Sequence, residues 1–110
     1  MFNYNVNFLL YNDSIVMISN IDVIRESVLF DDKWYVAFYC LKLKDRVDAA
    51  YHYDNYGWKL NYAPSPFFSS KKYLDVYYDV KNANMNPLVH YELHGKKEGR
   101  KIFSFVYDKL

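Results

Sequence analysis

The chain contains few of the residues that usually signal a specialised site: three glycines, three prolines and one cysteine among 110 residues. A single cysteine excludes an internal disulfide framework, and so few glycines leave no glycine-rich loop for a phosphate group. Fourteen basic and thirteen acidic residues give a net charge of +1, which provides no overall field to attract nucleic acid. We therefore expect no cofactor and no nucleic-acid partner.

Long hydrophobic runs are also missing, so no segment has the length of a membrane span, and the first residues lack the pattern of a signal peptide. We expect no membrane insertion and a cytoplasmic location. Aromatic residues, by contrast, make up 21% of the chain, with 13 Tyr and 8 Phe. Because a tyrosine buries a ring but needs a partner for its hydroxyl, this content predicts either a core with polar edges or a stacking surface for a ligand.

The first twenty residues have the pattern of a β-hairpin. Aromatic and aliphatic residues alternate with asparagines, and this period of two predicts a half-buried strand; the residues are Phe2, Tyr4, Val6 and Phe8 between Asn3, Asn5 and Asn7. A turn cluster and a branched run follow, so residues 1–20 are expected to form a hairpin. A lone hairpin needs a further element to cover it. We predict that residues 102–107 join it as a strand, because Phe103, Phe105 and Tyr107 fall on one face.

The rest of the chain contains two copies of one unit. Shifting the sequence by 38 residues against itself aligns eight identical residues without a gap, and periods of this size mark helical repeats. The pairs are Phe30 with Phe68, Lys33 with Lys71, Tyr35 with Tyr73, Tyr39 with Tyr77, His52 with His90, Tyr53 with Tyr91, Gly57 with Gly95, and Lys59 with Lys97. We assign residues 21–66 and 67–103 as tandem repeats within a single domain, residues 1–110.

Each copy has the signals of a helix–turn–helix. Its first helix is expected to be capped by Asp31 or Asp32 in copy one and by Ser69 or Ser70 in copy two, and to bury a stripe of tyrosines. The second helix is expected to begin at Asp48 and Asn86 and to end at Gly57 and Gly95, where glycine suits a left-handed residue. Asn20 is expected to cap a short helix over residues 22–27. The predicted fold class is α+β: an N-terminal hairpin with two tandem helix–turn–helix repeats.

Several motifs of copy two resemble a repeat found beside bacterial glycosyltransferases and in rhamnan-synthesis-type polysaccharide proteins. They are Asn86-Pro87-Leu88, His90-Tyr91, His94-Gly95 and Glu98-Gly99-Arg100. The resemblance covers about residues 24 to 103 and is weaker in copy one, which has Asp48-Ala49-Ala50 and Leu60-Asn61-Tyr62 at the corresponding places. It implies an accessory helical unit, without known chemistry, that is associated with surface-polysaccharide systems.

The residues that could carry chemistry are few. His90 and His94 have metal-ligand spacing on a predicted helix, but His52 and His90 recur in register, which favours a structural hydrogen bond over a metal site. Cys40 would need a base such as His52 to act as a nucleophile, and a buried, inert thiol is the favoured interpretation. We therefore expect no metal site, no catalytic residues and no enzymatic activity.

Six residues are candidates for binding: Trp34, Trp58, His94, Lys96, Lys97 and Arg100. Trp34 and Trp58 align with lysines in copy two, which predicts surface positions where an indole could receive a sugar ring or a partner protein. Packing of the two indoles along the surface is the alternative. Lys96, Lys97, Arg100 and Lys101 form a local basic run that suits an anionic ligand. The alternative is a solvated helix end, which is favoured because Glu98 interrupts the run.

These features predict a non-catalytic interaction module that acts on surface polysaccharide or on the machinery of its synthesis. The alternative is a small protein that binds and inhibits another protein, as phage and other mobile elements often encode. An exposed strand edge in the hairpin would serve this alternative, because it can pair with a strand of a partner or of a second copy in a homodimer.

Overall fold

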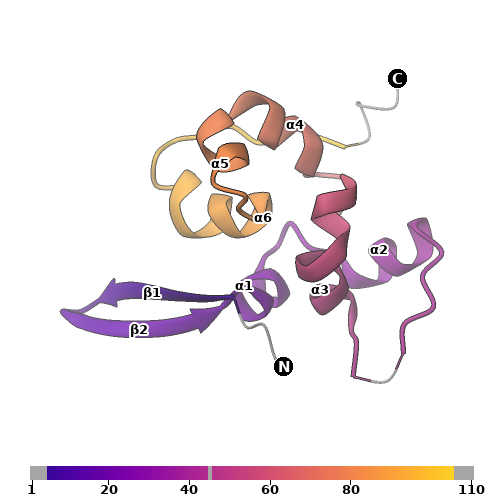
Figure 1. The fold of residues 1–110 in the computed structure, drawn as a ribbon, viewed down its shortest axis with the longest axis horizontal. Coiled ribbons are helices and arrows are strands. Elements are labelled where there is room, and N and C mark those ends of the chain that lie inside the picture. The colour runs from indigo at the N-terminus through magenta and orange to yellow at the C-terminus, as the bar shows by residue number, and fades with distance from the viewer. Residues whose placement is uncertain (1–4, 45, 106–110) are drawn as a thin grey trace.

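A computed structural model describes residues 5–44 and 46–105. The fold is α+β: an antiparallel hairpin of β1 (Val6–Tyr11) and β2 (Ser14–Ser19) precedes a series of helices, as predicted (Figure 1). The hairpin projects from the helical body, and α1 (Asn20–Glu26) lies at its base. Residues 12 and 13 form the turn, where Asn12 and Asp13 take the positive φ values that tight hairpin turns require.

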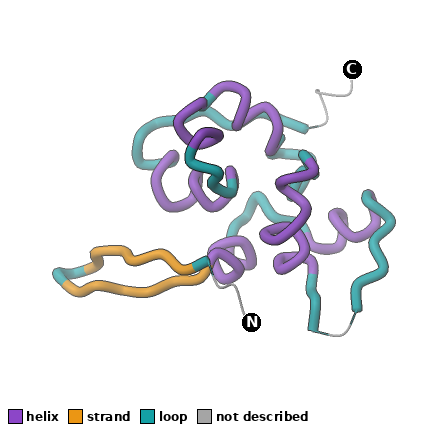
Figure 2. The backbone as a smooth tube through the Cα atoms, in the orientation of Figure 1, coloured by secondary structure: helices purple, strands orange, loops and turns teal. Residues whose placement is uncertain are grey.

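The two repeats form equivalent helix pairs, which are seen as neighbouring purple coils in Figure 2. Copy one consists of α2 (Asp32–Phe38) and α3 (Ala49–His52), and α3 runs into the π-helical turn η1 (Tyr53–Gly57) and the short η2 (Trp58–Leu60). Copy two consists of α4 (Ser70–Val76) and α6 (Pro87–His90), which runs into the π-helical turn η3 (Tyr91–Gly95). Copy two also has a short helix, α5 (Tyr78–Asn82), within its connector.

The predicted helix caps are present in both copies. The side chains of Asp31 and Ser69 accept from the backbone N–H groups three residues later at the start of α2 and α4. Asp48 caps α3, and Asn86 caps α6 with Pro87 in the first turn. The cap of α1 was predicted wrongly: Ser19 caps this helix, and Asn20 is buried instead, with its amide donating to Asp54.

A buried tyrosine lies at the centre of each copy. The hydroxyl of Tyr35 lies 2.7 Å from His52 Nδ1, and that of Tyr73 lies 2.8 Å from His90 Nδ1. The rings also repeat, since Tyr35 meets Tyr53 edge-on at 5.9 Å and Tyr73 meets Tyr91 at 6.1 Å. The tyrosines therefore form a core with polar edges, one of the two interpretations of the aromatic content.

A second tyrosine, directly after the first helix of each copy, forms a hydrogen bond to the end of that copy. Tyr39 accepts from the backbone N–H of Ala63 at 2.7 Å, and Tyr77 accepts from that of Lys101 at 2.6 Å, in both cases 24 residues later. The side chain that covers this tyrosine differs between the copies. Tyr62 stacks on Tyr39 with centroids 3.8 Å apart, whereas Arg100, the residue equivalent to Tyr62, places its guanidinium 4.9 Å from the Tyr77 ring.

The repeated glycines do not end the helices in the way that we predicted. Gly57 has a right-handed φ of −62°, and the left-handed residues come four positions later, at Asn61 and Gly99. Glycine is required because a Cβ at position 57 would collide with the Tyr35 hydroxyl, and one at position 95 with the Tyr73 hydroxyl. Close approach of two elements, rather than backbone conformation, therefore explains both glycines.

The hairpin presents to the body the face opposite to the one predicted. In the predicted half-buried strand, Val6 and Phe8 lie on the side that was expected to be buried, but Phe8 is 71% exposed. Phe2 and Tyr4, the other two residues of that side, lie outside the described residues. Leu9 and Ile18, on the other face, pack against the core. The prediction of the strands is confirmed, whereas the prediction of their buried face is wrong.

The described part of the predicted C-terminal strand is not a strand and does not reach the hairpin. Residues 102–105 run alongside residues 66–69 instead. Ser69 N–H donates to Phe103 O, and Phe105 N–H donates to Pro66 O at 3.0 Å. The Phe105 ring is buried against Trp34 and Phe38 of copy one. Positions 106 and 107 of the predicted strand lie outside the described residues.

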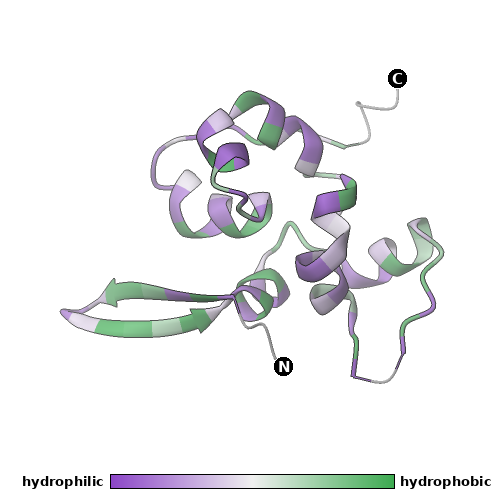
Figure 3. Cartoon of the chain, viewed as in Figure 1, coloured by the Kyte–Doolittle hydropathy of each residue, from purple (hydrophilic) through white to green (hydrophobic). Residues whose placement is uncertain are grey.

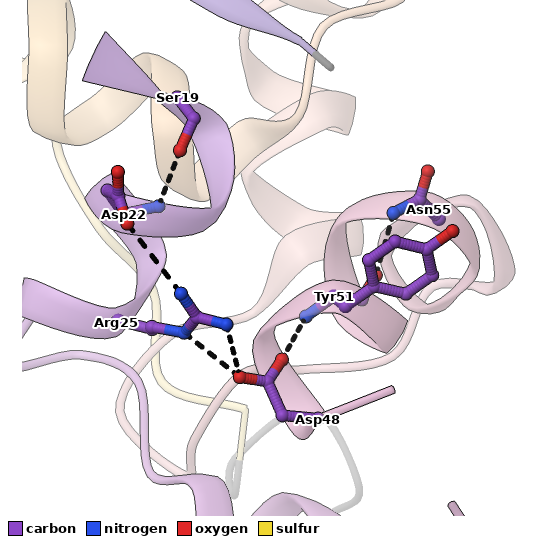
Figure 4. Close-up of polar contacts among 6 residues, drawn as sticks. All are labelled: Ser19, Asp22, Arg25, Asp48, Tyr51 and Asn55. Atoms are coloured by element: carbon purple, nitrogen blue, oxygen red, sulfur yellow. Dashed lines mark hydrogen bonds and ion pairs between the residues drawn. The ribbon is translucent and has the colours of Figure 1, made fainter. Parts of the chain in front are cut away.

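Helix α1 connects both copies to the hairpin. It packs against α3 of copy one and α6 of copy two. Figure 4 shows Arg25 of α1 between Asp22 and Asp48, with its Nε 2.9 Å from the Asp48 carboxylate. Ser27, just after α1, donates to Glu92 of copy two. Because the Arg25 pair is exposed, its contribution to stability is small, and the apolar packing of α1 carries most of the connection.

Candidate interaction surfaces

The outer side of the hairpin is an exposed apolar surface. Its residues are 67 to 76% exposed at Phe8, Leu10, Ile15 and Met17, and Val6 completes the row at 36%. The strand register places Phe8 opposite Met17 and Leu10 opposite Ile15, so these side chains share one face. We call these five residues the hairpin face. Figure 3 shows that hydrophobic residues make up much of both strands, which project from the helical body.

Neither strand carries the features that usually protect a sheet edge. Residues 6–19 contain one charged residue, Asp13 at the turn, and no lysine, arginine or proline. Within the described residues the sheet has two strands, so one edge of each strand is unpaired. An apolar face with two unprotected edges is the arrangement expected of a surface that meets another polypeptide.

A pocket lies where the hairpin and both copies meet, and we call it the junction pocket. Its volume is about 490 Å³, and five asparagines line it: Asn5, Asn7, Asn20, Asn84 and Asn86. Asp54, Trp58 and Lys59 of copy one contribute the rest of its polar wall. The pocket is therefore built from four separate segments of the chain.

The carboxylate of Asp54 lies at the centre of this junction and is 3% exposed. Its Oδ1 accepts from the amides of Asn20 at 3.1 Å and Asn86 at 3.0 Å, and its Oδ2 accepts a longer bond of 3.4 Å from Asn5. None of the ion pairs in residues 5–44 and 46–105 involves Asp54. A buried carboxylate is thus stabilised by neutral donors, and one of its oxygens has accepting capacity left.

The two tryptophans do not form the predicted exposed platform. Trp58 is buried, at 7% exposed, and its indole N–H donates to the Asp54 carbonyl at 2.8 Å. Trp34 is half-buried and stacks on Phe38 at 4.7 Å. The expectation of a surface position is therefore wrong for Trp58, although its side chain still reaches the wall of the junction pocket.

The predicted basic candidates lie in copy two, and acidic side chains already engage two of them. Lys96 pairs with Glu92 at 2.6 Å, which raises the pKa of the lysine. Arg100 donates to both carboxylate oxygens of Asp79 and to Glu98, and its hydrogen bonds lower the pKa of Asp79 to about 2. Lys97 and His94 are exposed. The structure does not bring these residues together with Trp34 or Trp58 into one site.

Two of the histidines lie beside buried tyrosines, and the cysteine is exposed. Burial lowers the pKa of both His52 and His90, so that each ring is favoured in its neutral form beside a tyrosine hydroxyl. Among the described residues, no three His, Cys, Asp or Glu side chains group as metal ligands. Cys40 is exposed, so the expectation of a buried thiol is wrong.

The residues of the junction pocket were missed at the sequence level, although the sequence carries a signal for them. Asparagine alternates with other residues in two distant segments, 3–7 and 82–86. Asparagine is depleted in strands and favoured in turns, so each segment was interpreted locally, as a strand face and as a connector. Of the hairpin face, Val6 and Phe8 were predicted to lie on the apolar side of a half-buried strand.

Two further observations bear on the class of protein. Compared with protein-family models, with curated proteins and with solved structures, the chain has no match. The resemblance to a polysaccharide-associated repeat therefore remains a prediction. Among the described residues, none of the helices combines the length and the apolar character needed to cross a membrane.

Proposed function

We propose that this protein is a non-catalytic interaction module that binds another protein through the hairpin face and an edge of the hairpin. The observation that carries this proposal is the orientation of the hairpin, which leaves the side chains of its more apolar side between 36 and 76% exposed. A hairpin with this composition is marginal in water without a cover on its apolar side. Contact with a partner would supply that cover.

The composition of the hairpin defines the chemistry of the partner. With Asp13 as the sole charged residue of the hairpin, charge complementarity would contribute little to recognition. The partner surface should therefore be apolar and uncharged, and should offer a strand whose backbone pairs with β1 or β2. Phe8 and Met17 face each other at the middle of the hairpin face, where hot-spot residues are generally found.

The test combines capture of a partner with a designed change in the hairpin face. The double variant Phe8→Lys/Met17→Glu places opposite charges on a cross-strand pair, so the hairpin should still form. The matched control is Val28→Lys/Val76→Glu, which changes two exposed apolar residues outside the hairpin in the same way. Both variants should keep their stability to within about 0.5 kcal/mol, because exposed positions tolerate substitution.

A captured protein supports the proposal when its purified form binds the wild type and the control equally and binds the hairpin variant at least tenfold more weakly. Hydrogen exchange should then slow at the β2 amides in the complex. Equal binding by all three proteins would overturn the proposal. A wild-type dimer that the hairpin variant abolishes in sedimentation would also overturn it, and would assign the hairpin face to a second copy of the chain.

A further inference from the structure

We propose that the junction pocket binds a neutral saccharide through its hydroxyl groups. This site shares Val6 with the hairpin face but does not depend on the function proposed above. Its volume of about 490 Å³ lies within the range of roughly 300–1,000 Å³ that is usual for small-molecule sites. Four segments of the chain converge on it, so its polar groups are held by tertiary structure rather than by one flexible loop.

The charge of the pocket indicates a neutral ligand. Its wall contains one carboxylate, Asp54, and one ammonium group, Lys59, which is held 5.8 Å from the centre of the Trp58 ring. These charges have opposite signs and cancel. A phosphate or other anion would meet the Asp54 carboxylate, and a metal ion would find a single carboxylate where several anionic ligands are usual.

The hydrogen-bonding groups of the pocket indicate a ligand with adjacent hydroxyls. Five asparagine amides share the wall, and each has two N–H donors and one acceptor oxygen. Those of Asn7, Asn20 and Asn86 also bond within the protein, whereas Asn84 is exposed. From the part of the chain that the structure describes, Asp54 Oδ2 accepts the 3.4 Å bond from Asn5 alone, so it can accept from a ligand hydroxyl. Because a sugar ring carries neighbouring hydroxyls that donate and accept, it matches this wall better than an apolar ligand does. Val6, Trp58 and Met85 add apolar surface for the C–H groups of the ring.

The two tryptophans allow a direct test by nuclear magnetic resonance. The chain contains Trp34 and Trp58, and only Trp58 lines the pocket, so Trp34 is an internal control. The ¹⁵N-labelled full chain is titrated with glucose, galactose, mannose and N-acetylglucosamine. Glucosamine and glucuronic acid serve as charged probes of the same ring size. We expect at least one neutral sugar to shift the Trp58 indole N–H and the asparagine amide signals saturably, without shifting Trp34.

A variant of the pocket wall strengthens this test. Asn84 is exposed and has a φ of 54°, so Asn84→Gly removes its amide without straining the backbone. The loss of one hydrogen-bonding group should weaken sugar binding by roughly three- to tenfold. Asn82→Gly, two residues away and outside the pocket wall, should bind as the wild type does. Unchanged signals outside the substituted segment show that both variants remain folded.

Three results would overturn this proposal. The first is that none of the neutral sugars gives a saturable shift at the pocket. The second is that Trp34 shifts together with Trp58, or that Asn84→Gly and the wild type bind equally, since binding would then lie elsewhere. The third is that glucosamine or glucuronic acid binds more tightly than every neutral sugar, which would assign the pocket to a charged ligand.

Discussion

At the scale of single residues, each copy is organised by a tyrosine, a histidine and a glycine. Tyr73 is fully buried, its hydroxyl lies against His90, and Gly95 leaves the space that this hydroxyl occupies. Burial raises the pKa of Tyr73, so the phenol keeps its proton, and the neutral histidine can accept it in a hydrogen bond. The same three residue types take the same places in copy one, which explains why they are identical between the copies.

Gly95→Ala should destabilise the protein by about 1–3 kcal/mol, because the added Cβ would collide with the Tyr73 hydroxyl. Tyr73→Phe should cost about 1 kcal/mol through the lost hydrogen bond. In the double variant the colliding oxygen is absent, so the combined loss should be clearly smaller than the sum of the two single losses. Urea unfolding of the four proteins measures this coupling.

Copy one provides the matched comparison for this cycle. A Cβ at position 57 would also lie 3.1 Å from the Tyr35 ring carbon Cζ, which Tyr35→Phe retains. The rescue of Gly57→Ala by Tyr35→Phe should therefore be less complete than the rescue in copy two. Additive losses in copy two, within about 0.5 kcal/mol, would show that the hydroxyl is not what excludes a side chain there.

At the scale of elements, the hairpin differs from the helices in how it is held. The helices contribute most of the buried apolar residues, whereas the hairpin contacts the core through the partly buried Leu9 and Ile18. Its polar anchors are a backbone bond from Asn20 N–H to Asn5 O at 2.8 Å and a side-chain bond from Asn7 to Asn20. The inward face of the hairpin thus carries asparagine as well as leucine, and the outward face is apolar.

Two adjacent leucines test this orientation directly. Leu9→Ala should destabilise the protein by about 1–3 kcal/mol, because Leu9 packs against the core while remaining partly exposed. Leu10→Ala should change stability by less than about 0.5 kcal/mol, because Leu10 is 75% exposed. Thermal or urea unfolding gives both values. A larger loss for Leu10→Ala would mean that the strand presents its other face to the body.

At the scale of the whole molecule, contacts that are distant in sequence join the hairpin and the two copies. Asn86 caps α6 with its Oδ1 and donates from its amide to Asp54 of copy one. Phe105, which follows copy two, is buried against Trp34 and Phe38 in the first helix of copy one. These links make the two copies one cooperative unit, so substitutions in either copy should shift the same unfolding transition.

Stability should fall as the pH is lowered through the histidine range. Burial places the pKa of His52 and His90 below the unfolded value of about 6.5, so the unfolded chain binds protons first. The free energy of unfolding should therefore be highest above this value and decrease on acidification towards the folded-state pKa values. Urea unfolding between about pH 7.5 and about pH 4.5 covers this window.

Asp79 provides a separate control at lower pH. Its pKa is lowered to about 2 by Arg100, so its contribution is present above the unfolded value of about 3.9 and is lost only on further acidification. Asp79→Asn should remove that lower step and leave the histidine step in place. A free energy of unfolding that does not change between neutral pH and the carboxylate range would contradict the role given to the two histidines.

The sequence by itself determined the features that depend on local signals. The caps Asp48 and Asn86 were predicted correctly, and Asp31 and Ser69 were each one of two predicted candidates. The tyrosine stripes were predicted correctly as well, because a cap or a helical face involves residues within one or two turns. The function could not be predicted in the same way, because its candidate surfaces are assembled from segments that are far apart in the chain.

Only the tertiary structure decided which side of the hairpin is covered, why Gly57 and Gly95 are glycines, and that Trp58 is buried. A period of two shows which residues share a face but not which face the body covers. The two glycines leave room for tyrosine hydroxyls on another helix. The junction pocket requires contacts among Asn5, Asp54 and Asn86. These are contacts between distant segments, and packing of the whole chain, rather than any local preference, sets them.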